Sequence, residues 1–140
     1  MDPALLRMVD AGERIPHMAY LQATLERSRL GIRMNRFHEQ FDLLLTPTMP
    51  LTAFDAGVQV ADASRQRDWI DWSPFTHPFN MTHQPAASMP CGFTTAGLPV
   101  AIQIVGKVYA DALVLRAARA FESIRPIALP PAAREPLRDP

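Results

Sequence analysis

Few residues in this 140-residue chain could break a covalent bond. A serine nucleophile needs a base within hydrogen-bond reach and donors aimed at the developing oxyanion. None of the serines sits at a sharp turn from a strand into a helix; they are Ser28, Ser64, Ser73, Ser88 and Ser123. The only lysine, Lys107, follows an apolar run, which is typical of an exposed charge at a strand end. These residues alone predict no serine catalytic centre.

Cys91 is the other possible nucleophile, with His77 or His83 as its base. A cysteine at the end of an apolar strand is usually a small buried hydrophobic residue, and its activation would need a neighbour that stabilises the thiolate. A cysteine-dependent hydrolase therefore stays an alternative, in which Cys91→Ala would abolish hydrolysis by the isolated chain. The histidines show neither HxH nor HExxH spacing, so we expect no metal site; they are His17, His38, His77 and His83.

Composition and charge narrow the class of protein. The positive and negative side chains balance to a formal net charge of zero, so neither a nucleic acid nor an anionic membrane is an expected partner. A single cysteine excludes an internal disulfide and fits a reducing compartment. No apolar run approaches the length of a transmembrane helix. We expect one domain in a soluble, cytoplasmic protein that uses no metal and no organic cofactor.

The stretch from Trp72 to Gly106 is the centre of the predicted fold. Apolar runs at Ala86–Phe93 and Leu98–Val105, separated by a turn at 95–97, predict an antiparallel hairpin in which Gly97 supplies a positive φ. Both faces of the second strand are largely apolar, which indicates that both are covered. The proline-dense residues before the hairpin predict a shaped loop that can hold a one-turn helix.

Two helices are predicted before this centre. The first has Asp2 as its N-cap, runs to about Val9 and is ended by Ala11-Gly12. The second runs from Pro16 to about Phe41. Its apolar residues at helical spacing predict a scaffold helix on the outer face of the sheet, and a partner-helix or dimer surface is the alternative; they are Met18, Leu21, Leu25, Ile32 and Phe37.

The remaining segments are a short strand, a long loop, a last helix and a tail. Residues 42–46 predict a buried strand stopped by prolines. Residues 51–73 show no period apart from a possible helical turn near 63–69, so we expect a loop packed on something absent, against which Trp69 and Trp72 lie. Asp111 is the predicted N-cap of the last helix, whose predicted buried stripe is Leu113, Ala117, Phe121 and Ile124.

The motifs of this centre resemble the C-terminal part of the amidase signature family. They read PFNMTHQPAASMPCGFTTAGLPVAIQIVG, followed by ADALVLRAARAFE, with LLLTPTMP upstream. The resemblance implies an α/β fold, the C-terminal part of an α/β/α sandwich with a mixed β-sheet, incomplete as a stand-alone domain. It assigns residues 1–125 to that domain, with a helical pair at 1–41, strands and a long loop at 42–106 and a helix at 110–125. Residues 126–140 are a proline-rich tail.

The resemblance also implies hydrolysis of a carboxamide through a serine nucleophile, a second serine and a lysine. In the family these lie in a Gly/Ser-rich region before the part seen here, and no serine of this chain lies in a Gly-Ser-Ser context. We therefore expect the chain to be inactive alone, as a truncated reading frame, a fragment or half of a split enzyme. Its expected partner is the missing N-terminal catalytic part or a complementary chain, and a homodimer is possible.

The segment matching residues 72–80 passes near the amide substrate in the resembling enzymes. On that basis Trp72, Phe75 and Phe79 would form apolar walls, and Ser73, Thr76 and Asn80 would offer hydrogen bonds. The structural alternative is that Asn80 ties the backbone of the loop and Phe79 belongs to the core.

Ser73 bears on the choice of substrate. In glutamine-hydrolysing subunits of tRNA-dependent amidotransferases, which belong to the family, the matching position tends to be an aspartate that holds the ammonium of glutamine. A neutral hydroxyl cannot form that ion pair, so the resemblance favours a general amidase over an amidotransferase A-subunit-like fragment. A non-catalytic binding module derived from the same fold is the alternative from another class.

Overall fold

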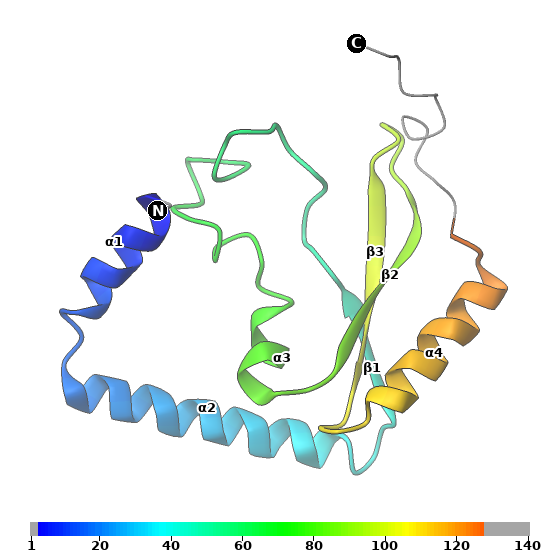
Figure 1. The fold of residues 1–140 in the computed structure, drawn as a ribbon, viewed down its shortest axis with the longest axis horizontal. Helices are drawn as coiled ribbons and strands as arrows, with labels where there is room; N and C mark the ends of the chain where they lie inside the picture. Colours follow the sequence, from blue (N-terminus) through cyan, green and yellow to red (C-terminus); the bar gives the residue numbers. More distant parts are fainter. Residues whose placement is uncertain (1–2, 128–140) are drawn as a thin grey trace.

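The structure is a computed structural model that describes residues 3–127. Three strands stand at its centre, with a helix on one side and a two-helix arm on the other (Figure 1). Along the chain the elements are α1 (Pro3–Gly12), α2 (His17–Phe37), β1 (Leu43–Pro47), α3 (His77–Thr82), β2 (Ala86–Phe93), β3 (Pro99–Gly106) and α4 (Asp111–Ile124). Asp2, the predicted N-cap, lies outside the described residues, as does the predicted proline-rich tail from residue 128 onward.

The sheet has the order β1-β3-β2, and both pairs of strands are antiparallel. The predicted hairpin is confirmed, and Gly97 has the predicted positive φ of 78°. The strand predicted at residues 42–46 is present as β1, but it has no buried residue and Leu45 is 60% exposed, so its predicted burial is wrong. Directly opposed residues share a face, so Gln103 lies with Thr46 and Ser88 on one face. A mixed sheet also needs parallel pairs, and residues 3–127 form none.

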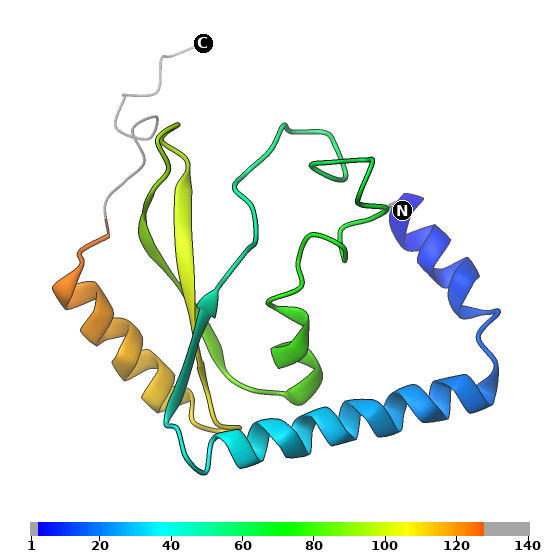
Figure 2. The ribbon, with the colours of Figure 1, turned by 180° about the vertical axis from the view of Figure 1, so that it is seen from behind.

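The core is small and lies around the end of β3. Its buried apolar side chains are Phe79, Ile104, Val105, Val114 and Ala118. Helix α4 packs on one face of the β2–β3 hairpin, and α3 lies on the other side of the sheet, as the two opposite views show (Figures 1 and 2). Only the last four residues of β3 are buried, so the prediction that both faces are covered is right for that half alone.

Helix α4 is rotated by about one residue from its predicted orientation. Val114 and Ala118 are its buried residues, whereas Ile124, predicted to be buried, is 85% exposed. The N-cap position is Ala110 rather than Asp111, which lies in the first turn. A carboxylate in the first turn still stabilises the helix through the macrodipole. Asp111 therefore marks the start of α4 correctly, although it is not the N-cap.

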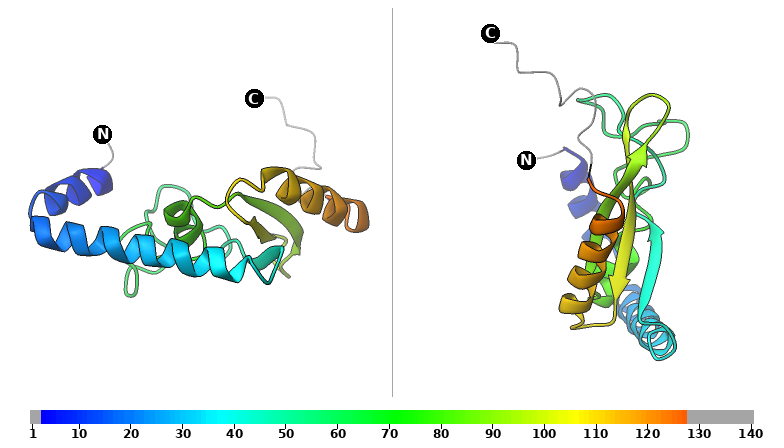
Figure 3. Two further views of the ribbon diagram at one scale, coloured as in Figure 1. Left: turned by 90° about the horizontal axis from the view of Figure 1, so that it is seen from below. Right: turned by 90° about the vertical axis from the view of Figure 1, so that its right-hand side faces the viewer.

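Helix α2 is longer than the sheet it was expected to cover and has no buried residue. Its described contacts are with α3, and Met18, Leu25 and Ile32 are each more than half exposed. The prediction of a scaffold helix on the outer face of the sheet is therefore wrong. Amphipathic spacing shows that one side of a helix is apolar, but it does not say what covers that side. Views along the other axes show the arm projecting away from the sheet (Figure 3).

Both predicted helix ends on this arm are displaced. Helix α1 continues to Gly12 rather than about Val9. Helix α2 ends at Phe37 rather than about Phe41, because a turn follows in which the His38 Nδ1 atom lies 3.0 Å from the Phe41 carbonyl oxygen. The Phe37 and Phe41 rings stack across this turn, with centroids 4.8 Å apart. Residues 38–41 thus keep a helix-like spacing without continuing the helix.

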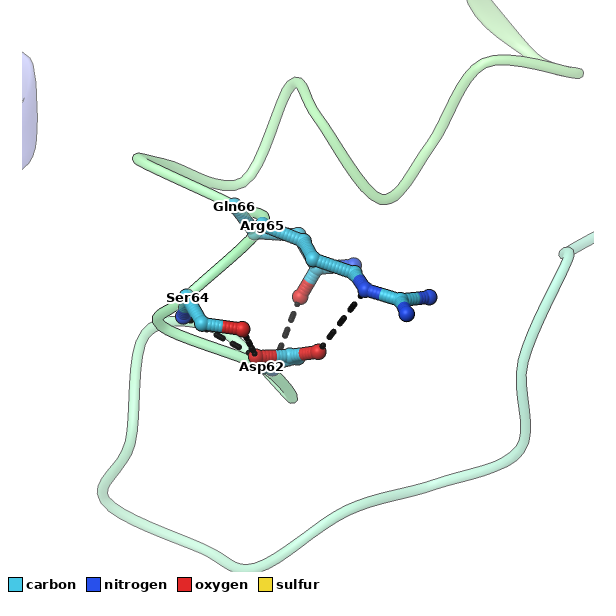
Figure 4. Close-up of polar contacts among 4 residues, drawn as sticks. All are labelled: Asp62, Ser64, Arg65 and Gln66. Atoms are coloured by element: carbon cyan, nitrogen blue, oxygen red, sulfur yellow. Dashed lines mark hydrogen bonds and ion pairs between the residues drawn. The ribbon is translucent and has the colours of Figure 1, made fainter.

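The long loop between β1 and α3 contains turns and bends but neither helix nor strand. The predicted helical turn near 63–69 is present as a single turn at Asp62, whose carbonyl oxygen accepts the Gln66 backbone N–H at 2.9 Å. The Asp62 carboxylate accepts hydrogen bonds from the backbone N–H and hydroxyl of Ser64 (Figure 4). Trp72 donates its indole N–H to the Gln59 carbonyl oxygen, 3.0 Å away, and packs edge-on against Phe54. The loop therefore supplies part of the wall that Trp72 was predicted to need.

Two glycines provide a matched test of this packing. A Cβ atom on Gly106 would lie 2.7 Å from Val114 Cγ2, whereas one on Gly31 in α2 would meet nothing within 4 Å. Gly106→Ala should lower the free energy of unfolding by about 1–3 kcal/mol through overpacking. Gly31→Ala should raise it by about 0.5–1 kcal/mol through helix propensity. Urea denaturation followed by circular dichroism measures both, and equal shifts would contradict the packing of α4 on β3.

Candidate functional site

The loop predicted to border the substrate is fastened to the sheet by Gln103. This residue is 5% exposed, and its Nε2 atom donates to the Thr46 hydroxyl at 3.1 Å and to the Phe75 carbonyl oxygen at 3.0 Å. One amide therefore joins β1, β3 and the loop. Sequence reasoning missed this role, although a glutamine inside an apolar strand is a recognisable signal, because a buried amide must find partners.

A second polar anchor holds the end of α3 against the end of β3. The Gln84 Nε2 atom donates to the Gly106 carbonyl oxygen at 3.2 Å. The Thr82 hydroxyl lies 2.8 Å from Gln84 Oε1 and 2.9 Å from the Pro78 carbonyl oxygen. Thr82 and Gln84 are both buried, so α3 is tied to the sheet at its C-terminal end, and Gln103 ties the loop that precedes it.

Ser73 lies at the middle of this loop and is buried. Its hydroxyl donates to the Trp69 carbonyl oxygen at 3.0 Å and lies 2.8 Å from His77 Nε2. The hydroxyl has one hydrogen, so when it bonds Trp69 the proton between Ser73 and His77 belongs to the imidazole. No carboxylate bonds to His77 among residues 3–127. The Ser73–His77 contact was not predicted from the sequence, and it holds the loop together. Because no third group orients His77, the pair does not have the geometry of a nucleophilic centre.

The other predicted site residues separate into covered and accessible ones. The Thr76 hydroxyl donates to the Ser73 carbonyl oxygen at 3.1 Å, and Phe79 is 7% exposed in the core. Trp72 and Phe75 are half-buried. The side chain of Asn80 is exposed and makes no hydrogen bond within the described part of the chain. Asn80 is thus the predicted polar residue most available to a ligand.

Two of the surface hollows among residues 3–127 are relevant to the site, and only one of these two borders this loop. That hollow has a volume of about 430 Å³ and lies between α2 and α3; its lining is Arg27, Trp69, Ile70, His77, Asn80 and Met81. The other, of about 420 Å³, lies over the far end of the sheet beside Thr48 and Ser88 and contains none of the predicted residues. Of the six predicted site residues, Asn80 alone lines the first hollow, and Arg27 and Trp69 were not predicted.

The alternative nucleophile has no catalytic geometry. The Cys91 thiol is half-buried, and its sulfur lies 3.6 Å from the Val100 carbonyl oxygen. No histidine bonds to it within residues 3–127. The same residues contain no group of three or more His, Cys, Asp or Glu side chains that could hold a metal ion. They also contain no helix long and apolar enough to cross a membrane.

The Ser73 contacts predict a stability effect. Ser73→Ala removes the bond to the Trp69 carbonyl oxygen and leaves the His77 Nε2 atom without its partner, so it should lower the free energy of unfolding by about 1–2 kcal/mol. The control is Ser123→Ala, whose hydroxyl bonds only within its own exposed helix and whose loss should change stability by less than about 0.5 kcal/mol. Equal urea midpoints for the two variants would refute the structural role.

The Asp62 turn predicts a titration effect. Hydrogen bonds from the Ser64 hydroxyl and backbone N–H lower the pKa of Asp62 below its ordinary value of 3.8. These bonds favour the folded turn above the unfolded pKa and are lost as the pH falls through the folded pKa. Ser64→Ala should therefore raise the pKa of Asp62, measured by NMR titration of its carboxyl carbon. Ser28→Ala, on distant α2, should leave it unchanged, and an unchanged value in Ser64→Ala would refute this cause.

Most of this chain matches one family of known proteins in sequence. The family model described as Amidase matches residues 2–115. An acylamidase of Rhodococcus erythropolis is 35% identical over 131 residues, which are 90% of this chain and 27% of that protein. The A subunit of the glutamyl-tRNA(Gln) amidotransferase of Myxococcus xanthus is 41% identical over 103 residues, 74% of this chain and 21% of that protein.

A solved structure shows the same arrangement. The crystal structure of a bacterial aryl acylamidase of the amidase signature family superposes with a TM-score of 0.75 at 30% identity, and covers 91% of this chain and 27% of that one. The chain thus spans about a quarter of the length of the proteins it matches. Because the family model covers most of its residues, this chain belongs to the amidase signature family.

Proposed function

We propose that this chain is the substrate-bordering portion of an amidase that hydrolyses a carboxamide through a Ser-Ser-Lys mechanism. In this proposal the catalytic serines and lysine lie on polypeptide outside these 140 residues, and the chain alone is inactive. The observation that carries it is the family match across residues 2–115 in a chain that spans about a quarter of its relatives. Gln103 fastens the loop before α3 to the sheet, and Gln84 fastens the end of α3. These contacts support a positioning role for the segment rather than a bond-breaking one.

The arm formed by α1 and α2 supports a requirement for further polypeptide. Large aliphatic side chains are exposed along it: Leu5, Leu6, Val9, Ile15, Met18, Leu21, Leu25 and Ile32. Apolar surface of this extent on one element normally lies against protein. The catalytic portion of the amidase, on the same polypeptide or on a complementary chain, is the covering surface we propose. We place the assembled protein in the cytoplasm, since one cysteine fits a reducing compartment.

The alternative is a role as part of an amidotransferase A-type subunit, which the 41% identity to the Myxococcus protein favours. That relative is one subunit of its amidotransferase, so this alternative also implies partner chains. Ser73 argues against glutamine as the substrate, because its neutral hydroxyl is buried and already bonded to Trp69 and His77. We therefore favour a general amidase.

A chimera tests the proposal. This chain replaces the matched stretch of the Rhodococcus acylamidase, and hydrolysis of acetanilide is measured by release of aniline. We expect the chimera to turn over the amide, and we expect this chain and the shortened acylamidase each to show no activity alone. The control is the same chimera with the nucleophilic serine of the acylamidase replaced by alanine.

Two outcomes would count against the proposal. Saturable turnover by this chain in isolation would place the catalytic groups within it. A well-folded chimera without activity, together with a monomeric isolated chain that melts cooperatively, would favour the non-catalytic binding module. Loss of any isolated activity in Cys91→Ala would instead support the cysteine-dependent alternative.

A further inference from the structure

Arg27 stands out because its charge is held in place without a carboxylate. Its Nε atom donates to the Met81 carbonyl oxygen at 2.8 Å, and its Nη2 atom lies 2.7 Å from His83 Nε2. Arginine has only donors, so His83 Nε2 is the acceptor in this contact and carries no proton there. Both partners of Arg27 are neutral, and no acidic side chain pairs with it among residues 3–127.

Four other arginines of the described chain have acidic partners, whereas further exposed arginines, such as Arg33, have none. Ion pairs join Arg29 to Glu26, Arg65 to Asp62, Arg67 to Asp71 and Arg119 to Glu122. The two acidic residues beside Trp69 and Ile70 are occupied by the loop itself. Asp68 accepts the Ile70 backbone N–H at 2.9 Å, and Asp71 accepts that of Arg67 at 2.7 Å. Neither lines the hollow that contains Arg27.

The rest of that hollow suits a small apolar group. Trp69, Ile70 and Met81 are three of its six lining residues, and its volume of about 430 Å³ lies within the usual range for small-molecule sites. The imidazole of His77 is held by Ser73 at 2.8 Å, so this one side chain of the lining is positioned before a ligand enters. Asn80 adds a side-chain amide that offers both a donor and an acceptor.

We infer that the hollow between α2 and α3 recognises an amide substrate that carries a carboxylate on an apolar, aromatic body, with Arg27 as the specificity-determining residue. This inference rests on the proposed function and names the substrate class. The ring lies against Trp69, Ile70 and Met81, and the carboxylate accepts from the N–H groups of Arg27 that Met81 and His83 leave unused. A charge-assisted bond of this kind is stronger than one to a neutral carbonyl.

The test uses three small probes on the purified chain: benzoate, benzamide and acetate. Binding is followed by NMR shifts of the Trp69 indole N–H. Benzoate should bind about fivefold or more tightly than benzamide because of the charge-assisted bond, and more tightly than acetate because of the apolar wall. The preference for benzoate should weaken as salt rises.

Variants locate the effect. Arg27→Met should remove the preference for benzoate over benzamide, and Arg27→Lys should retain part of it. Arg33→Met removes the same charge from α2 outside the hollow and should leave the preference intact. Equal binding of benzoate and benzamide, or equal effects of Arg27→Met and Arg33→Met, would overturn the inference.

The chimera with the Rhodococcus acylamidase supplies a second readout. There, 4-acetamidobenzoate should have a lower KM than acetanilide with a similar kcat, and Arg27→Met should raise the KM of the carboxylate substrate alone. An active chimera without this difference rejects the inference and keeps the proposed function. An inactive chimera, beside an isolated chain that binds benzoate through Arg27, rejects the proposed function and keeps only the recognition of an aromatic carboxylate by Arg27. Absence of benzoate binding to both proteins rejects the inference.

Discussion

The buried amide of Gln103 is the interaction on which the arrangement of this chain depends. It lies in the middle of an otherwise apolar strand and donates to one group on β1 and one on the loop before α3. A buried amide without partners would destabilise the sheet by more than a typical hydrogen bond stabilises it. The need to satisfy Gln103 therefore fixes the position of the Trp72–Asn80 segment along β3. Apolar contacts are not directional and would not fix that position by themselves.

The elements around Gln103 are buried to very different extents. The end of β3 is covered by α4 on one face, and α3 lies on the other side of the sheet. Helix α2 reaches past the sheet and has no buried residue. Hydrophobic burial is the main favourable term in folding, and the arm contributes little of it within this chain. The compared acylamidase is about three and a half times as long, since 131 matched residues are 27% of it. In the proposed function, additional polypeptide of this kind supplies the surface that covers the arm.

The polar groups of the site are of two kinds: those bonded within the chain and those accessible to a ligand. The hydroxyl and imidazole that the structure brings together, Ser73 and His77, are committed to each other and to the loop. What remains available to a ligand is an apolar wall, the amide of Asn80 and the positive charge of Arg27. Such groups bind and orient a substrate, and they do not break its bond. These groups support the proposal that the chain borders the substrate of an amidase.

By itself the sequence determined the hairpin, the strand before it, the irregular loop, the one-turn helix and the family. These depend on local patterns: alternating apolar residues, the φ of Gly97 and the density of proline. Through the family resemblance it also predicted that residues 72–80 border the substrate, and this stays a prediction.

Only the tertiary structure decided what each apolar stripe faces and which distant residues meet. The partnership of Arg27 with Met81 and His83 joins residues more than 50 positions apart, and the exposure of α2 depends on what lies beside it. No local pattern carries that information, since periodicity marks a surface as apolar or charged but leaves its partner unspecified.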